Sequence, residues 1–179
     1  MNGLIFMEVK KFVIATLGDH AWHKVVHTAG VPSRLYVPVA DYPDEELVAL
    51  LTTLSSTMGK PTPAMVEDLG AFIAPDLLGM FAYLIHRDWK TIDLIANTEE
   101  TIHEVLRRAG TKTNPPVLQS QRLSPQEVLV TYTSPRKLCA LAKGIAQGVA
   151  THYGERITIT ELTCMLQGGS MCELLITVV

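Results

Sequence analysis

The sequence predicts an α+β fold, in which a helical N-terminal half precedes a β-β-α-β-β unit with an antiparallel sheet. Two observations support this prediction. Apolar residues recur at helical spacing from residue 4 to about residue 109, whereas after residue 115 they alternate along short segments bounded by turn residues. Strands that follow one another through short turns pair antiparallel, which is typical of α+β proteins. With 179 residues and no visible linker or repeat, the chain is expected to form one domain, residues 1–179.

Helices are expected throughout the first half. Glycines end the first three of them, and Pro75 is expected to separate the fourth from the fifth. The last is the longest and is expected to end at Gly110, ahead of Pro115 and Pro116. The predicted helices span residues 4–17, 22–29, 44–58, 64–73, 77–85 and 89–109.

Strands dominate the second half. Two hairpins are expected, with turns at Ser124-Pro125 and Gly168-Gly169, and one helix connects them. The predicted strands span residues 117–121, 126–133, 157–166 and 171–178, and the helix spans residues 137–153.

Composition excludes several classes of protein. The net charge of -3 does not suit a nucleic-acid binder, which usually carries a basic patch. No run of about 18 apolar residues exists to cross a membrane. The N-terminal residues do not resemble a signal peptide, and three cysteines is an odd number for a disulfide framework. We therefore expect a cytoplasmic protein.

The segment from Tyr132 to Arg136 is a candidate anion site. In an extended chain Tyr132, Ser134 and Arg136 point to the same side, and Pro135 disfavours a helical conformation at the residue before it. All three side chains donate hydrogen bonds, and the guanidinium suits a carboxylate. The alternative interpretation is an ordinary strand end with surface polar groups.

A single histidine in the longest predicted helix, His103, is a candidate metal ligand. Neutral imidazole is the commonest metal-ligand side chain. The alternatives are a solvated histidine or one that is satisfied within the core.

These residues occur in the order of a known family. The stretch Met1–Ile5, then Gly18, Trp22, Ala29 and Gly30, then His103, Pro115-Pro116 and Tyr132-x-Ser134-x-Arg136 resembles the haem nitric oxide/oxygen-binding family over essentially the whole chain. The resemblance implies a haem b between the two halves, with His103 as axial iron ligand. It further implies that Tyr132, Ser134 and Arg136 hold the haem carboxylates. Pro116 or Pro115, together with Ile5, would pack against the macrocycle and help to tune it.

The resemblance also bears on which gas is bound. Members that bind oxygen stably carry a tyrosine at the position that is Leu141 here, and the other distal positions, Val9 and residues 71–74, are apolar as well. We therefore expect NO and CO to bind, with little stable oxygen binding unless Tyr83 supplies a donor. The family implies a non-enzymatic sensor that signals to a separate partner, commonly a histidine kinase or a cyclic-di-GMP enzyme.

A second candidate site contains Cys139, Cys164 and Cys172. Three thiolates on neighbouring elements suit zinc, and the chain resembles family members in which three cysteines and one histidine bind structural zinc. Glu161 occupies the expected histidine position, and His152 is an alternative fourth ligand. Free or oxidisable thiols are the other interpretations.

Two alternative functions remain open. One is a redox or haem sensor that uses the cysteines and the haem oxidation state. The other is a non-haem metal enzyme built on His20, His23 and His27, which share one helical face. The apolar residues between these histidines favour a buried opposite face and therefore solvated histidines.

Overall fold

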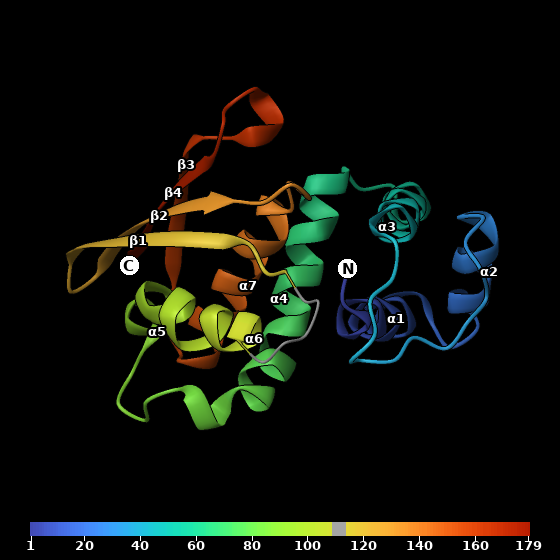
Figure 1. The fold of residues 1–179 in the computed structure, drawn as a ribbon. Coiled ribbons are helices and arrows are strands. Elements are labelled where there is room, and N and C mark those ends of the chain that lie inside the picture. Colours follow the sequence, from blue (N-terminus) through green and yellow to red (C-terminus); the bar gives the residue numbers. More distant parts are fainter. Residues whose placement is uncertain (109–113) are drawn as a thin grey trace.

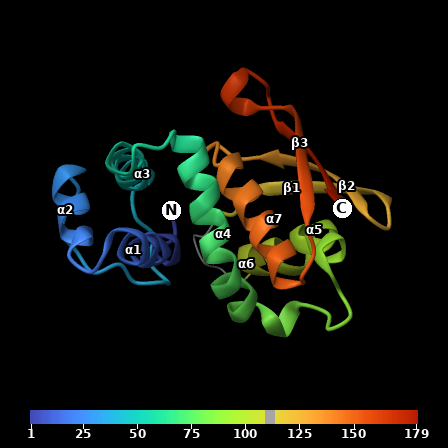
Figure 2. The same ribbon diagram turned by 180° about the vertical axis from the view of Figure 1, so that it is seen from behind.

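The computed structural model describes residues 1–108 and 114–179. The helix end predicted at Ala109 and Gly110 lies outside the described residues. Helix α4, Thr62–Met80, lies in the middle of the fold, with α1–α3 on one side and α5–α7 and the sheet on the other (Figures 1 and 2). Within the described ranges, no helix is long and apolar enough to cross a membrane.

The first three helices match their predictions: α1 is Gly3–Leu17, α2 is Ala21–Thr28 and α3 is Asp44–Met58. The Asn2 side chain caps α1 by accepting a hydrogen bond from the Leu4 amide at 2.9 Å. Gly18 ends α1 at a φ of 90°, which residues other than glycine rarely adopt. One apolar cluster joins these helices to α4 and includes Phe6, Leu50, Leu54, Met65 and Leu69.

The prediction of two helices separated at Pro75 is wrong, because α4 continues through Pro75 to Met80. A short 3-10 turn, η1, Ala82–Leu84, follows it. A proline inside a helix costs about 3 kcal/mol, since it removes a hydrogen bond and clashes with the preceding turn. Here Ile73, Ala74 and Leu78 are buried on either side of the proline, and their burial offsets this cost.

Helix α7, Cys139–His152, packs on α4 with almost no space between the two backbones. A Cβ atom added to Gly144 would lie 2.0 Å from the Glu67 carbonyl oxygen, and one added to Gly70 would lie 2.4 Å from the Leu141 carbonyl oxygen. Only glycine fits at these positions. The close crossing fixes Leu141 of α7 relative to the helices of the N-terminal half.

The longest predicted helix forms as three consecutive segments: α5, Thr91–Thr98; a π-helical turn, η2, Glu99–His103; and α6, Glu104–Arg108. The wider turn ends at His103. Turns of this kind are rare and occur frequently at functional sites.

The four strands form one antiparallel sheet in the order β1-β2-β4-β3, so the predicted α+β class is confirmed. Helices α5 and α7 contribute Ile92, Ala146 and Ala150 to a second apolar cluster with β2 and β4. A 3-10 turn, η3, Met165–Gln167, lies between the last two strands. The strands are β1, Val117–Ser124; β2, Glu127–Thr133; β3, Ile157–Thr163; and β4, Cys172–Val178.

Candidate functional site

His103 is held at the end of the π-helical turn with its side chain 14% exposed. Its Nδ1 atom lies 3.1 Å from Glu99 Oε2, which leaves Nε2 as the ring nitrogen available to a metal ion. Burial lowers the pKa of His103, outweighing the opposite effect of Glu99. The imidazole is therefore neutral near pH 7, which is the form that binds metals.

The segment that contains Pro115 and Pro116 lies beside this turn. The Pro116 carbonyl accepts a hydrogen bond from the Arg107 guanidinium at 3.0 Å. Arg107 also pairs with Glu99, at 2.6 Å. Both prolines are partly buried. The structure therefore brings together the candidate ligand and the two prolines that the sequence placed near it.

The three candidate anion-binding residues lie on one segment at the end of β2. Tyr132 and Ser134 are 2% and 3% exposed, whereas Thr133 between them is exposed, as the extended spacing predicted. Burial raises the pKa of the Tyr132 hydroxyl, so this group remains a protonated donor. The Ser134 Oγ atom accepts a hydrogen bond from the Arg136 amide at 3.3 Å.

Arg136 already binds a carboxylate in this structure. Its Nε atom donates to Asp44 Oδ2 at 2.9 Å, and its NH1 atom donates to the Asn114 carbonyl at 2.7 Å. Hydrogen bonds from Arg136 and from the amino group of Met1 lower the pKa of Asp44, outweighing the effect of burial. Sequence reasoning missed Asp44 because it lies far from Arg136 along the chain.

The predicted distal positions are only partly together. Val9 and Ile73 are fully buried members of one large apolar cluster, and Leu141 and Ile5 pack against that cluster, whereas Phe72 is 38% exposed. Tyr83, the alternative donor, is 76% exposed on η1. Val9, Ile73 and Leu141 therefore belong to the same apolar region.

One polar residue beside this cluster, Glu8, was missed. Its side chain is 2% exposed, and its Oε2 atom has no hydrogen-bond partner. Its other oxygen pairs with Lys11 at 2.7 Å, and Lys11 also contacts Asp76 of α4. Burial raises the pKa of Glu8. No pattern in the sequence indicates that a glutamate next to Lys10 and Lys11 is buried.

These residues fit a haem by their chemistry. Haem needs an axial nitrogen ligand, donors for its carboxylates and an apolar surface for its ring. His103 supplies a neutral imidazole whose second nitrogen is already oriented by a carboxylate. Tyr132, Ser134 and Arg136 supply donors, and the cluster around Val9 and Leu141 supplies apolar surface.

The three cysteines form a second cluster, in which all are buried and their sulfur atoms lie within 4.8 Å of one another. Cys164 is 3.9 Å from Cys139 and 4.0 Å from Cys172. Burial raises the pKa of Cys139 to about 12. Tyr132 packs against the same cluster and is the cross-strand neighbour of Cys172.

The structure does not bring the two suggested fourth ligands to the cysteines. Glu161 lies 3.3 Å from Lys143 Nζ, and it is not one of the residues of the cysteine cluster. His152 is exposed at the far end of α7 from Cys139, about 20 Å away by the rise of a helix. A tetrahedral metal ion at the three sulfurs would need its fourth ligand from elsewhere, such as water.

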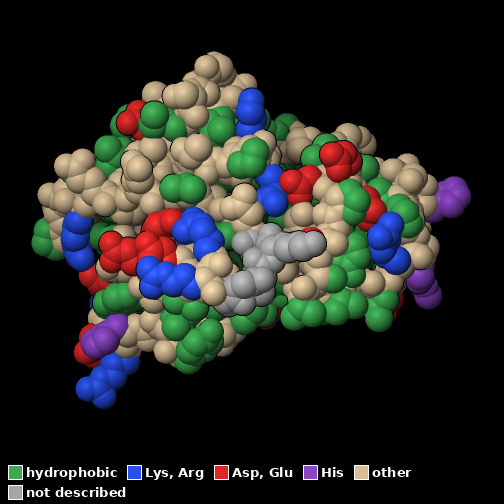
Figure 3. Space-filling model, viewed as in Figure 1, with side chains coloured by type: hydrophobic (Ala, Val, Ile, Leu, Met, Phe, Trp, Pro, Cys, Tyr) green, Lys and Arg blue, Asp and Glu red, His purple; other side chains and the backbone are tan. Residues whose placement is uncertain are grey.

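The three histidines of the alternative metal site, His20, His23 and His27, are all exposed at α2, and histidine side chains protrude at that end of the molecule in Figure 3. Among the residues that the structure describes, the cysteine cluster is the one group of three metal-binding side chains, and His20, His23 and His27 do not form another. These side chains are therefore a solvated face.

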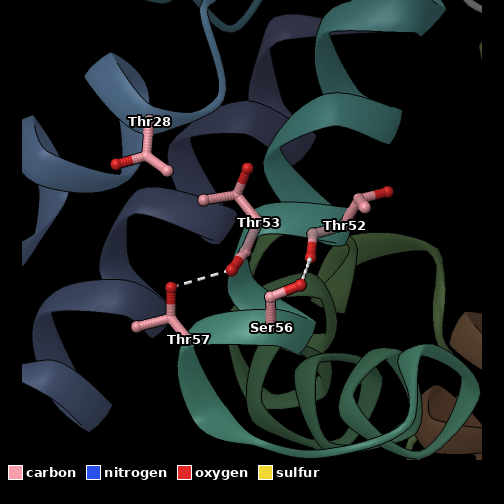
Figure 4. Close-up of a pocket in the computed structure, with 5 residues that line it drawn as sticks. All are labelled: Thr28, Thr52, Thr53, Ser56 and Thr57. Carbon is pink, nitrogen blue, oxygen red and sulfur yellow. Dashed lines mark hydrogen bonds between the residues drawn. The ribbon is translucent and has the colours of Figure 1, made fainter.

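A surface hollow between α2 and α3 has no catalytic character. Hydroxyl side chains line it, and in Figure 4 Ser56 and Thr57 turn back to their own helix. Ser56 donates to the Thr52 carbonyl at 3.1 Å, and Thr57 donates to the Thr53 carbonyl at 2.8 Å. No charged residue lines it.

Comparisons with known proteins identify a family. A family model described as haem-NO-binding matches residues 2–161. An H-NOX protein from S. oneidensis in the Fe(II)NO ligation state is 26% identical, with a TM-score of 0.92, covering 100% of this chain and 99% of that one. The H-NOX domain from Shewanella oneidensis in the Fe(II)CO ligation state is 25% identical, with a TM-score of 0.89 and coverages of 100% and 99%.

A more distant structure shows the fold alone. The Fe(II) unliganded H-NOX protein from K. algicida is 17% identical, with a TM-score of 0.85, and covers 100% of this chain and 97% of that one. A comparison with curated protein sequences gave no match. The family match spans most of the chain. The chain therefore belongs to the haem-NO-binding family, whose members are sensors and not enzymes.

Proposed function

We propose that this chain senses NO, and also binds CO, at a ferrous haem b whose iron is bound by His103. The observation that carries the proposal is the largely buried imidazole of His103, whose Nδ1 atom lies 3.1 Å from the Glu99 carboxylate, beside the segment that contains Pro116. The cysteines do not form the C-x-x-C-H motif of covalent attachment, which favours haem b. The bound haem supplies an iron atom that takes up the gas.

The surrounding residues have separate roles in this proposal. Tyr132, Ser134 and Arg136 donate hydrogen bonds to the haem carboxylates. Arg136 is suited to this because it already binds the carboxylate of Asp44. Pro116 or Pro115, together with Ile5, would pack against the ring and help to tune the iron.

The distal residues select the gas. Leu141, Val9 and Ile73 offer no hydrogen bond, and bound oxygen needs one whereas NO and CO do not. The relatives from Shewanella, whose structures hold Fe(II)NO and Fe(II)CO, support the assignment of both gases. Little stable oxygen binding is expected.

His103 would hold the iron, and the bound haem would supply an iron–histidine bond that NO weakens, so that signalling would begin with the release of His103. Glu99 of the turn that carries His103 accepts a hydrogen bond from the Leu118 amide of β1, and Arg107 of α6 joins Glu99 to the Pro116 carbonyl, so a movement of the turn would be passed to the sheet. A ligand shifts a conformational equilibrium only through different affinities for two states, and the broken bond supplies that difference. A separate histidine kinase or cyclic-di-GMP enzyme reads the change, and the sensor acts as a single domain in the cytoplasm.

Replacing the ligand tests this proposal. We expect His103→Gly to lose the absorption spectrum of histidine-bound ferrous haem, and added imidazole to restore it. His152→Gly removes an exposed histidine and is the control, with an unchanged spectrum. If His103→Gly kept the native spectrum without imidazole, the assignment of His103 would be wrong.

A zinc site at Cys139, Cys164 and Cys172 is a second candidate, because three buried sulfurs lie within reach of one ion. We expect the reduced protein to bind one equivalent of zinc and to unfold at a higher temperature when it does. Cys164→Ser removes the central sulfur and abolishes both effects. If zinc left the unfolding temperature unchanged, and oxidation of the thiols changed the output instead, the redox alternative would be favoured.

A further inference from the structure

Glu99 has three polar contacts around the candidate iron ligand. Its Oε2 atom lies 3.1 Å from His103 Nδ1 and accepts a hydrogen bond from the Leu118 amide at 2.9 Å. Its Oε1 atom accepts a hydrogen bond from Arg107 at 2.6 Å. The carboxylate is 18% exposed, so water competes weakly for these bonds. Glu99 therefore holds a fixed negative charge against the ring of His103.

A carboxylate in this position changes the chemistry of the ring. An ionised acceptor forms a stronger hydrogen bond with Nδ1–H than a neutral one does. It fixes the tautomer and orientation of the ring and increases the basicity of the other nitrogen. Hydrogen bonding to an axial ligand is also one of the means by which a protein tunes haem.

We propose that Glu99 is a positioning residue that strengthens the bond from His103 Nε2 to iron and so sets how readily NO releases His103. This inference rests on the proposed function, because it takes His103 as the iron ligand. Arg107 opposes Glu99, since its positive charge draws on the same carboxylate. The two residues therefore act in opposite directions on the donor strength of His103.

The simpler alternative is a purely structural role, in which Glu99 only ties the π-helical turn to β1 through Leu118. Under that alternative, removing either Glu99 or Arg107 loosens the turn, and both changes weaken the iron–histidine bond. Under the electronic role, the two changes have opposite signs. This difference in sign separates the two roles.

The test compares three variants of the haem-loaded protein. Glu99→Gln removes the charge but keeps an acceptor, Arg107→Gln removes the opposing charge, and Glu100→Gln is the control, because Glu100 is the exposed neighbour. The measurements are the iron–histidine stretching frequency by resonance Raman spectroscopy, the reduction potential, and the share of protein that keeps the iron–histidine bond under NO.

We expect Glu99→Gln to lower the stretching frequency and raise the reduction potential, because a weaker donor favours the ferrous state. The ratio of retained to released His103 under NO falls about tenfold, as is typical for loss of such an outer partner. Arg107→Gln shifts both the frequency and the potential in the opposite direction, and Glu100→Gln leaves them unchanged. Matching circular dichroism spectra establish that all three variants are folded.

Two results would overturn the inference. If Glu99→Gln and Arg107→Gln shifted the frequency in the same direction, the role would be structural; if neither differed from Glu100→Gln, Glu99 would have no influence on the iron. Failure of the underlying function has a different signature, because the unmodified protein would then show no iron–histidine band at all.

Discussion

The contact between α4 and α7 gives a sharp prediction for stability. A Cβ atom at Gly144 would lie 2.0 Å from the carbonyl oxygen of Glu67, and no side-chain rotation relieves a clash with backbone. The helices must separate by more than about 1 Å to restore ordinary contact, and overpacking of this kind costs about 1–3 kcal/mol. Alanine regains about 1 kcal/mol of helix propensity over glycine. Because the clash is with backbone, we take the overpacking cost at about 3 kcal/mol, the upper end of the range. After the gain in helix propensity, Gly144→Ala is expected to lower the free energy of unfolding by about 2 kcal/mol.

Gly79→Ala is the matched control for this substitution. Gly79 is also in a helix, but a Cβ atom there meets nothing within 4 Å, so the propensity gain remains and stability rises by about 1 kcal/mol. In thermal unfolding, where 1 kcal/mol corresponds to about 2–4 °C for a domain of this size, Gly144→Ala lowers the Tm by about 4–8 °C and Gly79→Ala raises it. If Gly144→Ala were as stable as Gly79→Ala, the close crossing of α4 and α7 would be wrong.

Three further predictions concern the gas, the pH dependence and the thiols. Leu141→Tyr adds a hydrogen-bond donor to the apolar cluster and is expected to give an oxygen complex that persists for minutes in air and is visible by absorption. If this variant formed no such complex, Leu141 would not be a distal residue. A hydrogen bond from Arg122 lowers the pKa of Asp93. The ionised carboxylate therefore stabilises the folded protein at pH values above the ordinary carboxyl pKa, and this contribution is lost as the pH falls through the lowered pKa. Asp93→Asn therefore loses about 0.5–1 kcal/mol at pH 7, measured by urea unfolding, and a loss that persisted at pH 2 would contradict this origin. Because burial raises the pKa of Cys139 to about 12, iodoacetamide at pH 8 is expected to label it more than about tenfold faster in unfolded than in folded protein; equal rates would contradict the buried, protonated thiol.

Much of the fold follows from local patterns in the sequence. Gly18 and Gly59 end their helices with positive φ, and β2 alternates buried and half-buried residues as a strand with one covered face does. Pro75 shows where local rules fail. The helix that contains it is stabilised by its packing against α7, which is distant in sequence, and such a contact cannot be inferred from nearby residues.

In the candidate site too, local features could be predicted and tertiary contacts could not. The spacing of Tyr132, Ser134 and Arg136 predicted that their side chains share one side, because alternate residues of an extended chain point the same way. The burial of these residues supports that prediction. The spacing of Glu99 and His103 is i, i+4 on a helix, so a search for side-chain partners would have found that pair. Asp44, in contrast, reaches Arg136 only through the tertiary fold, whereas the separation of His152 from Cys139 already follows from their places at opposite ends of the helix predicted over residues 137–153.

The absorption spectrum of the purified, reduced protein under oxygen, NO and CO in turn is the most direct test of the central claim. We expect a five-coordinate ferrous haem that oxygen leaves unchanged and that NO and CO each convert to a new species. A stable oxygen complex would contradict the apolar distal cluster around Leu141. Absence of bound haem after expression with haem supplied would contradict the role of His103 itself.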